Sequence, residues 1–96
     1  MSSSAIYVSE VPVLSTAHVC ATTMDLLLSG PTETPFGMVC TYPEGCFILF
    51  VAEDTMPTET PADLADLHRW LQKQPYHWCR LDADGDIVNG LPVYDW

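Results

Sequence analysis

An unbroken apolar run near the middle of the chain, Cys46-Phe47-Ile48-Leu49-Phe50-Val51, restricts the fold more than any other feature. Side chains of a strand alternate between two faces, so this run predicts a strand inside a sheet with both faces covered, at least in part. The β-rich residues 36–42 precede the run, and Pro43-Glu44-Gly45 connects the two. A three-residue connection that contains glycine is typical of a hairpin. The sequence therefore predicts an antiparallel hairpin at the centre of a sheet.

Two helices are predicted, one before the hairpin and one after it. Residues 21–29 form the first, and Gly30-Pro31 ends it. The second spans residues 60–74 and opens with Thr60 as N-cap, Pro61 at the first helical position and an acid in the first turn. Its buried stripe is predicted to consist of Leu64, Leu67 and Leu71.

Further strands are predicted at residues 5–14 and 77–81, with a small extra β piece at Ile87-Val88. The order β-α-β-β-α-β predicts an α+β fold. Its antiparallel sheet would carry two helices on one face, as in the ferredoxin-like plan. The 96 residues predict one compact acidic domain, residues 1–96, of which residues 1–4 are expected to be flexible.

Acidic residues outnumber basic ones by thirteen to three, which gives a net charge of −10. No lysine or arginine precedes Arg69. A hydrophobic content of 48% is too high for a disordered acidic tail, so the acids must lie on a folded body. Such a surface predicts a basic partner. It also argues against direct nucleic-acid binding, because three bases cannot offset thirteen acids.

The targeting features of the sequence predict a cytoplasmic protein. No basic residue precedes the first apolar stretch, so no signal peptide is expected. No apolar run approaches the roughly 18 residues of a membrane span, and anionic lipid would repel an acidic surface. In the cytoplasm the four cysteines are expected to be reduced thiols that belong to the core.

The predicted partner-binding surface is an acidic loop together with the exposed side of the helix that follows it. A loop and a helix can present several carboxylates together to a basic partner. Trp70 lies off the leucine stripe of that helix, and protein interfaces favour tryptophan as an anchor. The residues predicted to contact the partner are Glu53, Asp54, Glu59, Asp63, Asp66 and Trp70.

Two His-x-Cys pairs raise the alternative of a metal site. His18-Val19-Cys20 and His77-Trp78-Cys79 would each place both side chains on one face of an extended segment, and four such ligands suit zinc. Their spacing is not one of the familiar zinc forms, and Val19 and Trp78 favour ordinary strand packing. No metal or other cofactor is therefore expected.

Two other motifs have simpler interpretations. Asp82-Ala83-Asp84-Gly85-Asp86 alternates like the start of a calcium loop, but Ile87 and Val93 stand where such a loop needs glycine and an acid. A solvated turn is predicted instead. Cys46 could act as a nucleophile if one of the histidines served as its base, yet no flanking motif supports this. No catalytic residues are expected. The histidines concerned are His18, His68 and His77.

Four segments spread along most of the chain are distinctive. They are residues 15–19, 34–40, 44–48 and, above all, the ending from Leu81-Asp82-Ala83-Asp84-Gly85 to Gly90-Leu91-Pro92-Val93-Tyr94-Asp95-Trp96. These segments resemble a family of small acidic proteins of unknown function carried on bacterial plasmids and integrative elements. The resemblance implies no catalytic residues. It does imply a mobile-element protein similar in character to anti-CRISPR and antirestriction proteins, many of which block DNA-binding surfaces of host defence complexes.

The favoured hypothesis is a non-enzymatic inhibitor that binds the basic nucleic-acid-binding surface of a host defence complex. A type I CRISPR surveillance complex, prevented from binding DNA, is the expected target. One alternative is an antitoxin-like or other interaction module for a basic partner, held by aromatic anchors. The other alternative is a small metal-site or thiol protein. The sequence leaves the oligomeric state open.

Overall fold

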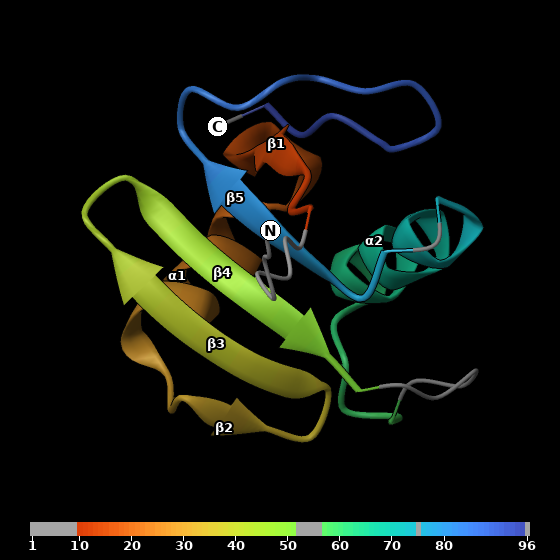
Figure 1. Ribbon diagram of the computed structural model, residues 1–96. Coiled ribbons are helices and arrows are strands. Elements are labelled where there is room, and N and C mark those ends of the chain that lie inside the picture. The colour runs from red at the N-terminus through yellow and green to blue at the C-terminus, as the bar shows by residue number, and fades with distance from the viewer. Residues whose placement is uncertain (1–9, 52–56, 75, 96) are drawn as a thin grey trace, which may run out of the picture.

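The computed structural model describes residues 10–51, 57–74 and 76–95. The predicted flexible residues 1–4 and the first half of the strand predicted at 5–14 lie outside this part of the chain. Figure 1 shows the elements along the chain. They are β1 (Val13–Ser15), the 3-10 helix η1 (Thr16–His18), α1 (Ala21–Ser29), β2 (Glu33–Thr34), β3 (Gly37–Tyr42), β4 (Gly45–Phe50), α2 (Ala62–Lys73) and β5 (Trp78–Asp82).

The strands form one mixed sheet in the order β1-β5-β4-β3-β2. The α+β class is therefore confirmed, and β4, which contains most of the apolar run, is the middle strand as predicted. The prediction of a wholly antiparallel sheet is wrong, because β1 runs parallel to β5 while the other pairs are antiparallel. The strand order also does not reproduce the ferredoxin-like plan, in which the first strand lies inside the sheet.

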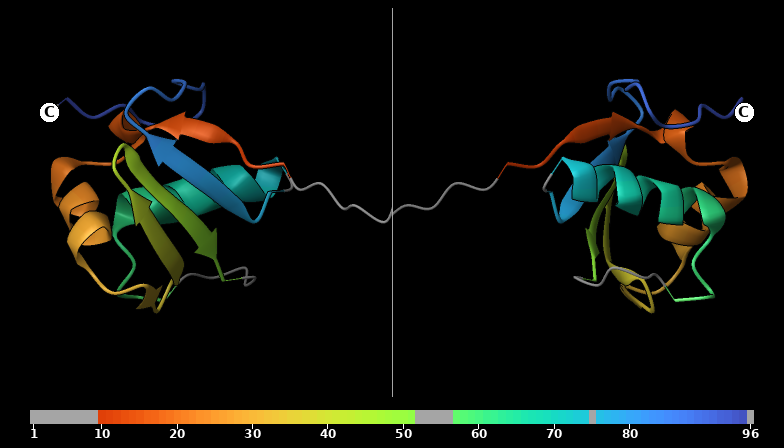
Figure 2. Two further views of the ribbon diagram at one scale, coloured as in Figure 1. Left: turned by 60° about the vertical axis from the view of Figure 1, so that its left-hand side comes forward. Right: turned by 90° about the vertical axis from the view of Figure 1, so that its right-hand side faces the viewer.

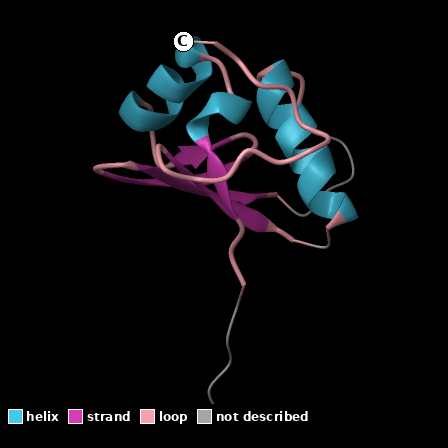
Figure 3. Cartoon of the chain, turned by 90° about the horizontal axis from the view of Figure 1, so that it is seen from above, coloured by secondary structure: helices cyan, strands magenta, loops and turns pink. Residues whose placement is uncertain are grey.

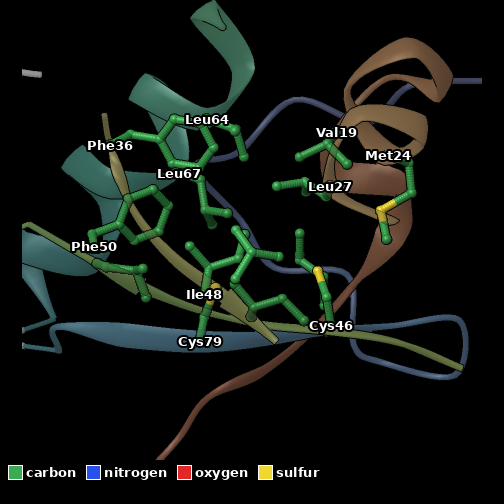
Figure 4. Packing of buried hydrophobic residues seen from close by; sticks show 14 of the residues in the cluster. Val19, Met24, Leu27, Phe36, Cys46, Ile48, Phe50, Leu64, Leu67 and Cys79 are labelled. Atoms are coloured by element: carbon green, nitrogen blue, oxygen red, sulfur yellow. The ribbon is translucent and has the colours of Figure 1, made fainter. Parts of the chain in front are cut away.

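Both helices lie on the same face of the sheet, as Figures 2 and 3 show. The core between them and the sheet takes alternate residues of the strands, among them Cys46, Ile48 and Phe50 of β4 (Figure 4). The stripe predicted for α2 is confirmed, since Leu64, Leu67 and Leu71 are all buried. Burying one such side chain contributes about 1.5–3 kcal/mol.

The helix boundaries agree closely with the sequence prediction. Helix α1 has the predicted bounds, and Gly30 N–H donates to the Leu26 carbonyl over 2.8 Å at its end. Helix α2 begins at Ala62, so its N-cap is Pro61 instead of the predicted Thr60. Neither described helix has the length and apolar content needed to cross a lipid bilayer.

The C-terminal segment, residues 83–95, contains no helix and no strand and is held to the body by His18. His18 is 1% exposed. Its Nε2 accepts the Val88 N–H over 3.0 Å, so Nδ1 carries the proton and donates to the Pro92 carbonyl over 2.8 Å. The β piece predicted at residues 87–88 is absent there, and an isolated bridge pairs Asp86 with Leu14 instead.

Candidate functional site: the open sheet face

The face of the sheet opposite the helices is uncovered within the part of the chain that the structure describes. Figure 1 looks onto this face, with α1 and α2 behind the strands. The cover predicted for both faces of the apolar run is therefore found on one face only. We call the uncovered surface the open sheet face. It consists of Met38, Cys40 and Tyr42 of β3, Phe47 and Leu49 of β4, and Trp78 and Arg80 of β5.

Strand register arranges these side chains in rows across the sheet. One row runs from Met38 through Leu49 to Trp78, with Glu33 of β2 at its outer end. Because paired residues point to the same face, this acid lies beside the apolar row. Met38 is 45% and Leu49 47% exposed, so the row leaves a large apolar area uncovered.

The next row runs from Cys40 through Phe47 to Arg80. The Phe47 ring lies 6.4 Å from that of Trp78, and the Arg80 guanidinium lies 5.8 Å from the Phe47 ring centre. A shallow cavity of about 430 Å³ opens over the two rows. Its lining is Met38, Cys40, Phe47, Leu49 and Trp78.

A polar corner closes the open sheet face where β3 and β5 end and β4 begins. Tyr42, Gly45 and Asp82 are in register, and the glycine leaves no side chain between the other two. The Tyr42 hydroxyl therefore reaches across β4 and donates to Asp82 Oδ2 over 2.6 Å. Arg80 donates to both partners, to the Tyr42 oxygen over 2.7 Å and to Asp82 Oδ2 over 3.0 Å.

These donors change the acidity of Asp82. The Tyr42 hydroxyl, the Asp84 backbone N–H and Arg80, in this order, lower the pKa of the Asp82 carboxyl from 3.8 to about 2. The Arg80 pKa is raised, chiefly by its hydrogen bond to Tyr42. The corner is thus a fixed ion pair, and the guanidinium is oriented by the Tyr42 ring 5.0 Å below it.

The composition of the open sheet face is that of a protein interface. Tyr, Trp, Phe, Met and Arg are enriched at interface centres, whereas free carboxylates are depleted there. The acids lie at its margins instead: Glu33 on β2, Glu44 in the hairpin turn and Glu10 before β1, all exposed. Trp78 is tied to this margin, because its Nε1 donates to the Glu10 carbonyl over 3.2 Å.

Among the acidic residues predicted to contact a partner, those that the structure describes are not brought together. Glu53 and Asp54 lie outside the described residues, and Glu59 is exposed near the sheet edge. Asp63 is only 6% exposed. Its carboxylate accepts the Cys20 N–H over 2.8 Å and the Thr23 hydroxyl over 2.9 Å, so it joins the start of α2 to the start of α1. Asp66 pairs with Arg69 one turn further along α2.

Trp70, the aromatic residue predicted as an anchor, is half-buried. Its Nε1 donates to the Asn89 carbonyl over 3.0 Å, and its ring packs next to Gly90, whose φ of +95° suits glycine. Trp70 and Asp66 line a polar groove of about 520 Å³ between α2 and the C-terminal segment. In this structure Trp70 therefore fastens the C-terminal segment to α2.

The residues considered for metal or thiol chemistry form no metal-binding cluster in the described part of the chain. No three His, Cys, Asp or Glu side chains gather at metal-binding distance anywhere in the described ranges. All four cysteines are free; Cys46 and Cys79 are buried as predicted, but Cys40 is exposed, which the prediction did not expect. Burial raises the pKa of the Cys46 thiol to about 11. Cys20 is half-buried.

Sequence reasoning missed the open sheet face, although its signal was present. The run Cys46 to Val51 is apolar at every position because both faces of β4 are apolar. The same apolar pattern is found in a strand covered on both faces and in a strand covered on one face with the other exposed.

The fold and this surface define a small α+β domain that exposes an aromatic sheet face with an acidic margin. The chain belongs to a family of unknown function (DUF5983): the profile of the family's C-terminal domain matches residues 11–96. No curated protein and no solved structure gives a match.

Proposed function

We propose that this domain is a non-enzymatic binding protein that docks a basic protein on its open sheet face. The observation that carries the proposal is the uncovered face itself, on which three aromatic rings and Arg80 lie beside Met38 and Leu49. Anchors of these residue types dominate the affinity of protein interfaces. In the complex, the partner buries the face of β4 that points away from the helices.

Charge selects the partner. Eight acids in the described part of the chain are exposed: Glu10, Asp25, Glu33, Glu44, Glu59, Asp84, Asp86 and Asp95. A second copy of the chain would bring another net charge of −10 to the interface, which opposes self-association. A basic protein is attracted by the same field, which accelerates association at low salt.

The specific form of this proposal is inhibition of a nucleic-acid-binding complex in the cytoplasm. Such complexes carry lysine and arginine along the path of the phosphate backbone. The domain occupies that path, with the margin acids on the basic residues and the aromatic rows on the protein surface beside them. A type I CRISPR surveillance complex is the target we test first.

The test is a mobility-shift assay in which the purified protein is added to the surveillance complex before its target DNA. We expect DNA binding to be blocked, with weaker blocking as salt rises. Leu49→Ser should weaken the block at least about tenfold, because the partner would no longer bury a leucine side chain in the middle of the apolar row. Leu28→Ser is the matched control, because Leu28 on α1 is also 47% exposed but lies on the helix side. Equal potency of the two variants would refute docking through the open sheet face.

A second candidate is an antitoxin-like module that neutralises a basic protein outside DNA defence. The aromatic rows favour it, because contacts made by them resist salt better than contacts made by carboxylates. If no surveillance complex is inhibited, a pull-down with wild-type protein and Leu49→Ser would test it. A basic protein retained at high salt by wild type alone is the expected result.

A further inference from the structure

A third cavity lies on the helix side of the sheet, between α1 and the β2–β3 edge. We call it the side pocket. It measures about 210 Å³. Its walls are almost wholly apolar, and Leu27 and Phe36, labelled in Figure 4, form part of them. The full lining is Leu26, Leu27, Pro31, Thr34, Pro35, Phe36, Val39 and Glu59.

Glu59 is the charged member of this lining. Its side chain is exposed, and its Oε2 accepts the neighbouring Thr58 hydroxyl over 3.0 Å. No base contributes to the lining. The side pocket thus combines an apolar interior with one carboxylate at its margin.

The size of the side pocket suits a single side chain. Sites for drug-sized ligands measure about 300–1,000 Å³, which is more than the side pocket provides. Among single side chains, lysine and arginine have an apolar stem and a cationic end, and they bury the stem while the cation stays near water or a carboxylate. Apolar walls with one acid at the margin complement this shape and charge.

We infer that the side pocket receives one arginine or lysine side chain of a bound protein, with the stem against Leu26 and Phe36 and the cation on Glu59. This inference rests on the proposed function in one respect, that the partner is basic. It adds a contact on a different surface from the open sheet face. The recognition is a charge-assisted hydrogen bond at the end of an apolar slot.

The test needs no partner protein, because the probe is N-acetyl-arginine amide. Its binding is monitored through the backbone amide chemical shifts of the protein. At about physiological salt, where distant charges are screened, we expect saturable shifts confined to residues 26, 27, 34, 36, 39 and 59. N-acetyl-citrulline amide has nearly the same shape without the charge and should bind about two- to fivefold more weakly. Equal binding of the two probes would overturn the inference.

Matched variants separate this pocket from general attraction to an acidic protein. Glu59→Gln should reduce arginine binding to the citrulline level, whereas Glu44→Gln, which removes an exposed acid in the hairpin turn, should not. Leu26→Ser should weaken binding, and Leu28→Ser should leave it unchanged, although both leucines are 47% exposed on α1. Equal effects within either pair would overturn the inference. Because Leu49 lies outside the pocket, failure here leaves the test of the open sheet face unaffected.

Discussion

At the scale of single residues, Asp82 shows how a charge is retained in a nearly covered position. Its carboxylate accepts hydrogen bonds from the Tyr42 hydroxyl, the Asp84 N–H and Arg80. Three donors replace the water that burial removes, and all of them favour the ionised form. The carboxylate therefore links the end of β5 to the end of β3 across β4.

Replacement of Asp82 should change how stability depends on pH. The folded pKa of about 2 lies below the ordinary value of 3.8, so ionised Asp82 contributes stability above about pH 4. This contribution is lost as pH falls towards 2. We expect the melting temperature of Asp82→Asn to lie below that of wild type at pH 6, with the gap closing between pH 4 and 2. Tyr42→Phe removes one hydrogen-bond donor to Asp82. The loss of stability in acid should therefore begin at a higher pH in this variant than in wild type. A difference in melting temperature between Asp82→Asn and wild type that does not change with pH would contradict this explanation.

His18 has an equally defined role, because both ring nitrogens bond the C-terminal segment. His18→Ala leaves the Val88 N–H and the Pro92 carbonyl without partners and opens a cavity. We expect a loss of about 2–4 kcal/mol in urea unfolding. The Val88 amide should also exchange faster with solvent. His77→Ala removes an exposed histidine and should stay within about 0.5 kcal/mol of wild type.

At the scale of elements, one carboxylate connects the two helices. Helix α1 has no side-chain cap of its own, and Asp63 of α2 bonds the Cys20 N–H and the Thr23 hydroxyl at its start. Asp63→Ala should therefore cost about 2–3 kcal/mol in urea unfolding. Asp66→Ala breaks an exposed pair with Arg69 and should cost at most about 1 kcal/mol. Similar losses would mean that Asp63 does not anchor α1.

Local signals explain which elements the sequence could predict. Gly30-Pro31 ends α1, and the leucine spacing sets the buried side of α2, so both helices follow from neighbouring residues. The hairpin of β3 and β4 is also local. The partner of β1 is not, because Val13 to Ser15 pair with residues 80–82, far along the chain.

The candidate site was harder to predict than the elements for a related reason. Sequence reasoning grouped acids that are neighbours in the chain, but Asp63 turns inward to α1 while Asp66 turns to Arg69. The open sheet face collects residues from three strands, and only their register brings Met38, Leu49 and Trp78 into one row. Register depends on pairing across the whole sheet, which no single segment encodes.

At the scale of the whole molecule, the apolar face and the net charge of −10 have opposite effects on self-association. Repulsion keeps copies apart at low salt, whereas about 1 M salt reduces the screening length to about 3 Å. We therefore expect the sedimentation-average mass of wild type to rise between low and high salt. Leu49→Ser should show less of this rise than Leu28→Ser. A mass that is constant with salt would show that the face does not promote self-association.

The parallel pairing of β1 with β5 also sets an order of events in folding. Hairpin β3–β4 can form as soon as residue 50 is available, because its strands are neighbours in the chain. Strand β1 cannot be placed until residues 80–82 exist, and the bridge to Asp86 needs still later residues. Contacts between distant parts of a chain slow folding. During synthesis on the ribosome, the edge of the sheet is therefore the last part to close, and nascent chains stopped before residue 80 would leave β1 without its partner.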